Sequence, residues 1–171
     1  MKVISLLQPW ATLVVIGAKK IETRSWNTKY RGEILIHASK KMTREQKELA
    51  DSKPFLDAFE KNNIEELPLG KIIGKVKIID TASTSFFASA LNISDEKTFG
   101  NFSAGRYGWL LRDPVSFQHH FPVNGNRSLW DFNEKICLQC GCSEKDACIH
   151  PDFGPCWWVE EYLCSHCTEI A

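Results

Sequence analysis

All seven cysteines of this 171-residue chain lie within its last 35 residues, between Cys137 and Cys167. The outer four form two C-x2-C pairs, Cys137/Cys140 and Cys164/Cys167, with 23 residues between the pairs. Each pair can offer two thiolates to one ion, and two pairs complete a tetrahedron with Zn–S distances near ~2.3 Å. The pattern predicts a zinc site. Because this ligand set leaves no open position beside a carboxylate, we expect the zinc to be structural.

The three inner cysteines allow two interpretations. Cys142, Cys148 and Cys156 could hold a second zinc together with His150 or His166, since three sulfurs and one imidazole make a legitimate ligand set. They could equally be small buried apolar residues, as free cysteines often are. We expect Trp157 and Trp158 to pack the tail against the rest of the chain.

The cellular compartment and the charge balance limit the possible partners. Pro9 and Trp10 interrupt the first apolar run, which lacks a small-residue cleavage site, and no run approaches the ~20 apolar residues of a membrane span. We therefore expect a cytoplasmic protein outside the membrane, where reducing conditions disfavour disulfides. The chain has 21 basic and 21 acidic residues, so any contact with nucleic acid has to come from a local patch.

Before the cysteines, the sequence predicts a small, partly open β-barrel with flanking helices, an α+β and mainly β fold. An apolar run after Pro9 predicts a short buried helix that ends at Gly17. We expect strands at 32–39 and 70–80, two more on either side of a turn at Asp113-Pro114, and helices that begin near Thr43 and Pro54. Residues 81–105 are small and polar, which predicts a long loop with one helical turn at most.

The charged run after Gly17 is the candidate binding site. Lys19, Glu22 and Arg24 follow the predicted helix closely and could present one acceptor and two cations to a polar ligand. Trp10 could stack on a base, which contributes about 1–3 kcal/mol. The alternative is that Glu22 and Arg24 form an ion pair with each other on a solvent-exposed surface, where such pairs contribute about 0–1 kcal/mol to stability.

Several motifs together resemble the ASCH domain, a family within the PUA-like superfamily. The family signature G-x-K-x-x-E-x-R falls on Gly17, Lys19, Glu22 and Arg24, and the strand that follows, "RGEILIHASK", also matches. Further matches are "LGKIIGKVKIID", "GRYGWLLRDPVSF" and "VNGNRSLWDF". The resemblance implies a PUA-like domain over residues 1–132. Residues 133–171 then form a zinc-ribbon or knuckle-like module, similar to cysteine-rich segments appended to bacterial and phage proteins.

The resemblance implies a function in binding RNA, single-stranded nucleic acid or a modified nucleotide. The ligand would lie in a cleft formed by Trp10, Lys19, Glu22 and Arg24, and the zinc tail could add a protein partner. The alternative is a small hydrolase, an amidohydrolase or a ribonuclease, with Glu22 as general base and Lys19 as the group that stabilises charge. In the family's amidohydrolase a threonine stands at the position of Glu22. Thr23 is next to it but on the other face of the strand, so it cannot simply take that role.

Overall fold

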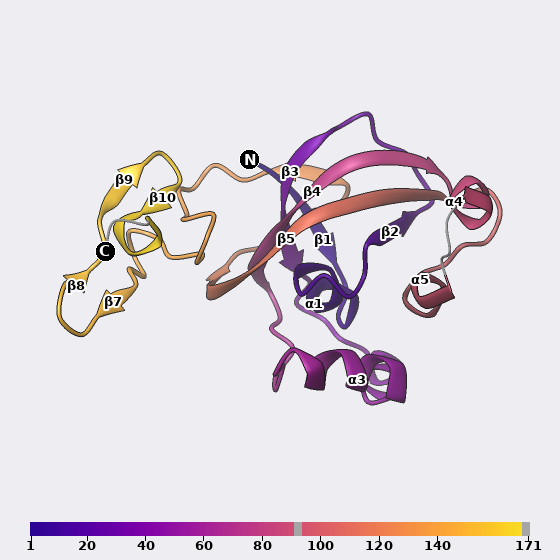
Figure 1. The fold of residues 1–171 in the computed structure, drawn as a ribbon, viewed down its shortest axis with the longest axis horizontal. Coiled ribbons are helices and arrows are strands. Elements are labelled where there is room, and N and C mark those ends of the chain that lie inside the picture. Colours follow the sequence, from indigo (N-terminus) through magenta and orange to yellow (C-terminus); the bar gives the residue numbers. More distant parts are fainter. Residues whose placement is uncertain (91–93, 169–171) are drawn as a thin grey trace.

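The computed structural model describes residues 1–90 and 94–168, without the side chains of Ser94 and Asp95. Its main element is one six-stranded sheet that curves around a short helix (Figure 1). The strands are β1 (Lys2–Leu6), β2 (Ile21–Arg24), β3 (Gly32–Ala38), β4 (Lys71–Ser83), β5 (Tyr107–Pro122) and β6 (Leu129–Asp131). The expected mainly β, partly open barrel with flanking helices is confirmed.

The strand order is β2-β5-β4-β3-β1-β6, so β2 and β6 are the two edges of the sheet. β1 runs parallel to β3, and the other neighbours are antiparallel. The last strand of the sheet in sequence, β6, lies beside the first, β1, and the amino group of Met1 donates to the carbonyl oxygen of Phe132 at 2.7 Å.

The predicted turn at Asp113-Pro114 is wrong, because β5 continues through both residues as one strand. Lys75 pairs with Val115 and Lys77 pairs with Arg112, so β5 has one residue more than β4 between these two pairs. A β-bulge accommodates the extra residue and also suits a proline, which has no amide for the ladder. The positive φ of Asp113, 51°, belongs to the bulge.

α1 (Trp10–Val15) packs into the concave side of the sheet, and five of its six residues are buried. The predicted end of this helix at Gly17 is confirmed, since Gly17 has a φ of 76°. Close packing between α1 and β4 requires Gly74. A Cβ there would lie 2.6 Å from Val15 Cγ1 and 2.3 Å from the carbonyl oxygen of Val115, and no side chain fits at those distances.

Two further helices, α2 (Arg44–Ala50) and α3 (Lys53–Lys61), lie beside α1 in Figure 1. Thr43 caps α2 as predicted, in a capping box with Gln46 in which each side chain accepts from the other residue's amide. Pro54 stands in the first turn of α3, where its missing amide costs nothing.

The predicted long loop over residues 81–105 is wrong, because it contains α4 (Thr84–Ala90) and α5 (Ser94–Phe99). Residues 91–93 of that prediction lie outside the described part of the chain. Tertiary packing accounts for the two helices. Phe87 is buried against Ile21, and Phe99 meets Phe55 edge to face at a centroid distance of 5.0 Å. These contacts join residues that are far apart in sequence, so a local sequence pattern does not predict them.

The cysteine-rich tail projects from one end of the barrel (Figure 1). It contains two short hairpins and a final helical turn: β7 (Ile149–His150) with β8 (Gly154–Pro155), β9 (Trp158–Glu160) with β10 (Leu163–Cys164), and η1 (Ser165–Cys167).

Apolar residues near the start of the tail attach it to the barrel. Ile136 is fully buried in a cluster with Phe117 and Phe132, and the amide of His119 donates to the carbonyl oxygen of Cys140 at 2.8 Å. The expectation that tryptophans dock the tail is wrong for Trp157, whose exposed fraction is 62%. Trp158 packs against the cysteines of the tail itself.

Candidate functional site

The three charged residues that follow α1 converge in the folded chain. Only 2% of Lys19 is exposed, and its Nζ lies 3.6 Å from Glu22 Oε2 while also donating to the carbonyl oxygen of Ile21. Arg24 Nε lies 3.0 Å from Glu22 Oε1. The carboxylate is therefore held between two cations, and each of its oxygens faces one of them.

Lys19, Glu22 and Arg24 line a cavity of about 420 Å³ together with Trp10. The structure thus brings together all four residues that the sequence predicted for the cleft. They reach the cavity from α1, from the turn that follows it and from β2.

Arg106 also lines this cavity, and the sequence did not predict a role for it. Its guanidinium donates to the carbonyl oxygen of Thr23 at 3.2 Å, and its buried Nε has no hydrogen-bond partner among the described residues. The lack of a side chain at Gly100 leaves room for Lys19, since a Cβ at position 100 would lie 3.2 Å from Lys19 Nζ. Arg106 and Gly100 lie far from β2 in sequence, so only the long-range fold shows their proximity.

Thr23 lines the cavity as well, although it alternates with Glu22 along β2. Its Oγ1 accepts a hydrogen bond from the amide of Asn101 at 3.1 Å. The hydroxyl thus helps to hold the segment after α5 against β2.

Glu96 of α5 fixes the start of β2. Its two carboxylate oxygens accept from the amides of Lys20 at 2.7 Å and Ile21 at 3.0 Å, and the residue is buried. Hydrogen bonds to an ionised carboxylate are stronger than neutral ones. Glu96 therefore sets the backbone position between Lys19 and Glu22, a role that sequence reasoning missed.

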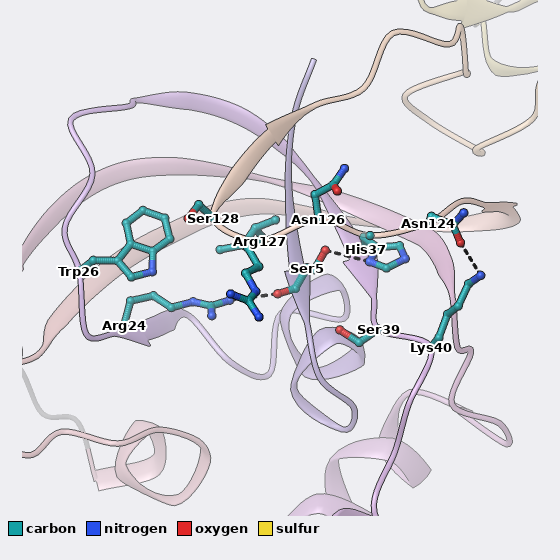
Figure 2. Close-up of a pocket in the computed structure, with 12 residues that line it drawn as sticks. Ser5, Arg24, Trp26, His37, Ser39, Lys40, Asn124, Asn126, Arg127 and Ser128 are labelled. Carbon is teal, nitrogen blue, oxygen red and sulfur yellow. Dashed lines mark hydrogen bonds between the residues drawn. The ribbon is translucent and has the colours of Figure 1, made fainter.

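A second cavity, of about 690 Å³, lies on the other side of Arg24 (Figure 2). Arg24 and Ser5 line both cavities, and the guanidinium donates to the carbonyl oxygen of Ser5 at 3.2 Å. The larger cavity adds Trp26, His37, Ser39, Lys40 and the segment 124–128. Arg24 is therefore the cation that the two cavities share.

His37 lines the larger cavity and is a buried, hydrogen-bonded histidine. Its Nδ1 lies 3.0 Å from Ser5 Oγ and its Nε2 lies 3.2 Å from the carbonyl oxygen of Val123. Burial lowers the pKa of His37 below its usual 6.5, and the charge of Lys40 lowers it further.

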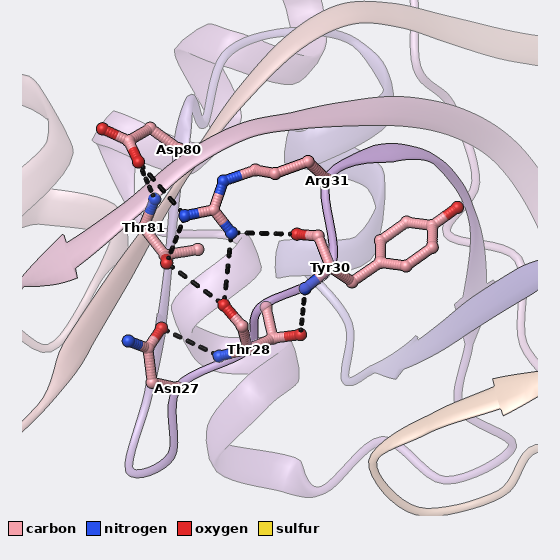
Figure 3. A network of polar contacts seen from close by, with 6 residues as sticks. All are labelled: Asn27, Thr28, Tyr30, Arg31, Asp80 and Thr81. Atoms are coloured by element: carbon pink, nitrogen blue, oxygen red, sulfur yellow. Dashed lines mark hydrogen bonds and ion pairs between the residues drawn. The ribbon is translucent and has the colours of Figure 1, made fainter.

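A polar network fixes the loop that carries Trp26 between β2 and β3 (Figure 3). The guanidinium of Arg31 donates to Asp80 at 3.2 Å, to Thr81 Oγ1 at 2.8 Å and to the carbonyl oxygen of Thr28 at 3.2 Å. Trp26 itself packs edge to face on the buried Trp109, at a centroid distance of 4.7 Å. The wall of the larger cavity is thereby tied to β4 and to the core.

The four outer cysteines of the tail form a group that could hold a metal ion. The sulfurs of Cys137, Cys140, Cys164 and Cys167 all lie within 4.8 Å of one another. The two C-x2-C pairs therefore meet in the fold, as the sequence predicted, through β10 and the turns on either side.

Cys142 and Cys148 belong to a second such group, which they form with Cys140 and Cys164. Cys156 lies beside it, with its sulfur 3.6 Å from that of Cys142. Burial raises the pKa of Cys148 to about 12.

The two histidines that the sequence offered as further ligands are placed differently. His150 Nδ1 accepts from the amide of Asp152 at 3.1 Å, and its ring stacks near Phe153. His166 Nδ1 lies 3.6 Å from the sulfur of Cys148, and its buried Nε2 has no hydrogen-bond partner among residues 1–90 and 94–168. Of these two histidines, His166 is the one that lies beside a cysteine of the second group.

These observations define a curved, mainly β domain with a charged cavity beyond its first helix and an attached cysteine cluster. The sequence profile of the ASCH domain matches residues 4–106, which is more than half of the chain. The chain belongs to the ASCH domain family.

Two curated proteins named activating signal cointegrator 1, from Mus musculus and from Homo sapiens, are each 32% identical to this chain over 136 residues. The match covers 78% of this chain but only 22% of each relative, so the chain spans about a fifth of their length. A crystal structure of ASCH from Zymomonas mobilis aligns with a TM-score of 0.45 and 18% identity, over 71% of this chain and 73% of that one. Within the described residues, every helix is too short or too polar to cross a membrane.

Proposed function

We propose that the cavity lined by Lys19, Glu22 and Arg24 binds RNA, single-stranded nucleic acid or a modified nucleotide. The observation that supports this best is the carboxylate of Glu22, which is held between two cations at the wall of a cavity. An ion pair of this kind on an open surface would only brace the strand. Here it keeps a hydrogen-bond acceptor and a guanidinium side by side, facing a space of nucleotide size.

Each side chain has a chemical role in this proposal. The guanidinium of Arg24 can engage a phosphate with two parallel hydrogen bonds. Glu22 can accept from the exocyclic amine of a base, and Trp10 offers an aromatic face for stacking. Lys19 is almost fully buried and contacts Glu22, so it positions the carboxylate.

The charge that attracts a polyanion is local. The net charge of the chain is zero, but Arg106 lines the smaller cavity while Lys40 and Arg127 line the larger one, with Arg24 between them. A nucleic-acid strand that crosses Arg24 would meet cations on both sides. Such a strand would give salt-dependent binding without a basic protein.

The alternative function, hydrolysis of a modified nucleoside or RNA with Glu22 as general base, has less support. Both oxygens of Glu22 face cations, at 3.6 and 3.0 Å. Each ion-paired oxygen keeps a lone pair that can accept a hydrogen bond from a ligand, but a general base would have to take up a whole proton and give up an ion pair. The arrangement therefore favours binding over catalysis.

We also propose that Cys137, Cys140, Cys164 and Cys167 hold a structural zinc ion and that residues 133–171 form a separate zinc module. Four thiolates with no open position are typical of structural zinc. A reducing compartment such as the cytoplasm keeps the thiols available. The exposed apolar residues of this module, among them Trp157, offer a surface to a protein partner.

The test of the binding function is a comparison of Arg24→Ala with the wild type. Fluorescence anisotropy with a labelled single-stranded RNA and the matching DNA gives the two affinities. Because a hydrogen bond to a charged group contributes about 1.5–3 kcal/mol, we expect affinity to fall about ten- to hundredfold. The slope of log K against log salt should decrease by about 0.7–1.

Two further variants make the test specific. Arg24→Lys keeps the charge but loses the two-pronged geometry, so it should recover only part of the affinity. Arg44→Ala removes an exposed arginine of α2 outside both cavities and should bind like the wild type. Equal affinity for the wild type and Arg24→Ala would contradict the proposal.

A further inference from the structure

The seven cysteines of the tail form one continuous cluster instead of two separate sites. The two groups of sulfurs that could hold a metal ion have Cys140 and Cys164 in common. Cys164 is fully buried, and its sulfur lies 3.8 Å from that of Cys140 and 3.7 Å from that of Cys148. It therefore contacts the outer cysteines and the inner ones at the same time.

The distances between these sulfurs are those of a tetrahedral metal site. With Zn–S bonds of about 2.3 Å, two sulfurs of one tetrahedron lie about 3.8 Å apart. The sulfurs of Cys140 and Cys164, of Cys148 and Cys164, and of Cys142 and Cys156 are 3.8, 3.7 and 3.6 Å apart. A disulfide would need about 2.05 Å.

The position of the inner cysteines in the fold shows what a second ion would do. Cys148 directly precedes the β7–β8 hairpin, Cys156 directly follows it, and the amide of Cys156 donates to the carbonyl oxygen of Cys148 at 2.9 Å. The hairpin itself exposes Ile149 and Phe153 and has only two residues in each strand. A hairpin without an apolar core needs a further link between its two ends. A metal ion bound by these thiolates would provide that link.

We propose that the tail holds two zinc ions bridged by the thiolate of Cys164. Cys137, Cys140 and Cys167 complete the first site, and Cys142, Cys148 and Cys156 complete the second. Two tetrahedral ions need eight ligand positions, and seven thiolates fill all eight when one of them is shared. The inference rests on the proposed zinc site of the outer cysteines and adds a second ion and a bridge to it.

The structure also defines the competing arrangement. His166 could supply the eighth position, because its Nδ1 lies 3.6 Å from the sulfur of Cys148. In that case the second ion would be held by Cys142, Cys148, Cys156 and His166, and no thiolate would be shared. The bridge is favoured because the sulfur of Cys164 lies 3.8 Å from that of Cys140 and 3.7 Å from that of Cys148, the spacing expected for ligands of one ion on either side of it.

The experiment is a metal count on the full-length chain, purified under reducing conditions with zinc and measured by inductively coupled plasma mass spectrometry. We expect two zinc ions per chain for the wild type and for His166→Ala, and one for Cys142→Ser. The chain is then loaded with ¹¹³Cd. Its NMR spectrum should show two cadmium signals that are split by each other, because scalar coupling passes through the shared sulfur of Cys164.

The possible outcomes separate the proposals. One zinc per wild-type chain overturns the second ion but leaves the outer zinc site intact, and no zinc overturns both. Two ions with unsplit cadmium signals, and the loss of one ion in His166→Ala, overturn the bridge in favour of the histidine. The cadmium spectrum is measured on the wild type, so it decides the question even if Cys142→Ser does not fold.

Discussion

The side chain of Arg24 lines two cavities, and the neighbouring sequence predicts its place in only one of them. The signature of charged residues predicted its proximity to Lys19 and Glu22, since the three follow one helix closely. The contact with the carbonyl oxygen of Ser5 depends on the placement of β1 beside β3. Local spacing therefore predicted the charged cluster, whereas the second cavity required the fold.

At the same scale, His37 should make the stability of the fold depend on pH. Its pKa in the folded chain is below the usual 6.5 because burial disfavours the charged ring. As the pH falls through about 6.5, the unfolded chain takes up this proton before the folded one does, so stability decreases. We expect His37→Gln to lose less stability than the wild type between pH 7.5 and pH 5.5.

Urea unfolding at the two pH values measures this difference. Gln118→Ala is the control, because Gln118 is an exposed residue of the same sheet and carries no titrating group. It should keep the wild-type pH dependence. Equal losses in His37→Gln and in the wild type would mean that His37 does not carry the effect.

At the scale of elements, local signals predicted the ends of helices well and failed where long-range packing decides. Thr43 and Gly17 were identified from capping chemistry, which acts within one turn. Asp113-Pro114 has the composition of a turn, but pairing on both sides of β5 keeps the strand continuous through a bulge. α4 and α5 are held by Phe87 and Phe99, whose partners lie far away in sequence.

The contact between α5 and β2 gives a prediction at this scale. Glu96→Gln replaces one accepting oxygen by a donor that faces a backbone amide, so one amide loses its partner. We expect the free energy of unfolding to decrease by about 1–3 kcal/mol, because an unsatisfied buried donor costs that much. RNA affinity should decrease as well, since these amides set the positions of Lys19 and Glu22.

Chemical denaturation and anisotropy on the same preparation test both effects. Glu60→Gln changes an exposed glutamate of α3 and should leave stability and affinity within error of the wild type. A Glu96→Gln protein with wild-type stability would show that the carboxylate contributes nothing to the position of β2.

At the scale of the whole molecule, the barrel and the tail derive their stability from different sources. The barrel has apolar clusters around α1 and within the sheet, whereas the buried cluster of the tail consists of cysteines. The position of the cysteine cluster could be anticipated from the cysteine spacing alone. The way the tail attaches could not, because Ile136 stands out in no sequence pattern and yet is completely buried.

Metal removal should therefore unfold the tail and spare the barrel. Structural zinc contributes roughly 10–16 kcal/mol to a small module, and the loss of that much cannot be offset by two short hairpins. After treatment with EDTA, trypsin should cut at Lys135 and Lys145, while the sites in β4 stay protected. Mass spectrometry of the fragments over time provides the measurement.

The same digestion of the zinc-loaded protein is the control and should leave Lys145 uncut for longer. Rapid loss of the barrel fragment after chelation would show that the barrel and the tail unfold as one cooperative unit.

The carboxylate of Glu96 has a consequence for how copies of this chain meet one another. β2 is an edge strand, and free amides on such an edge invite a strand from a neighbouring molecule. By occupying the amide of Ile21, a residue of β2, Glu96 withdraws that amide from any such addition. Shielding of this kind works against edge-to-edge pairing of sheets, so the brace beside the charged cavity also removes one point at which a strand could be added.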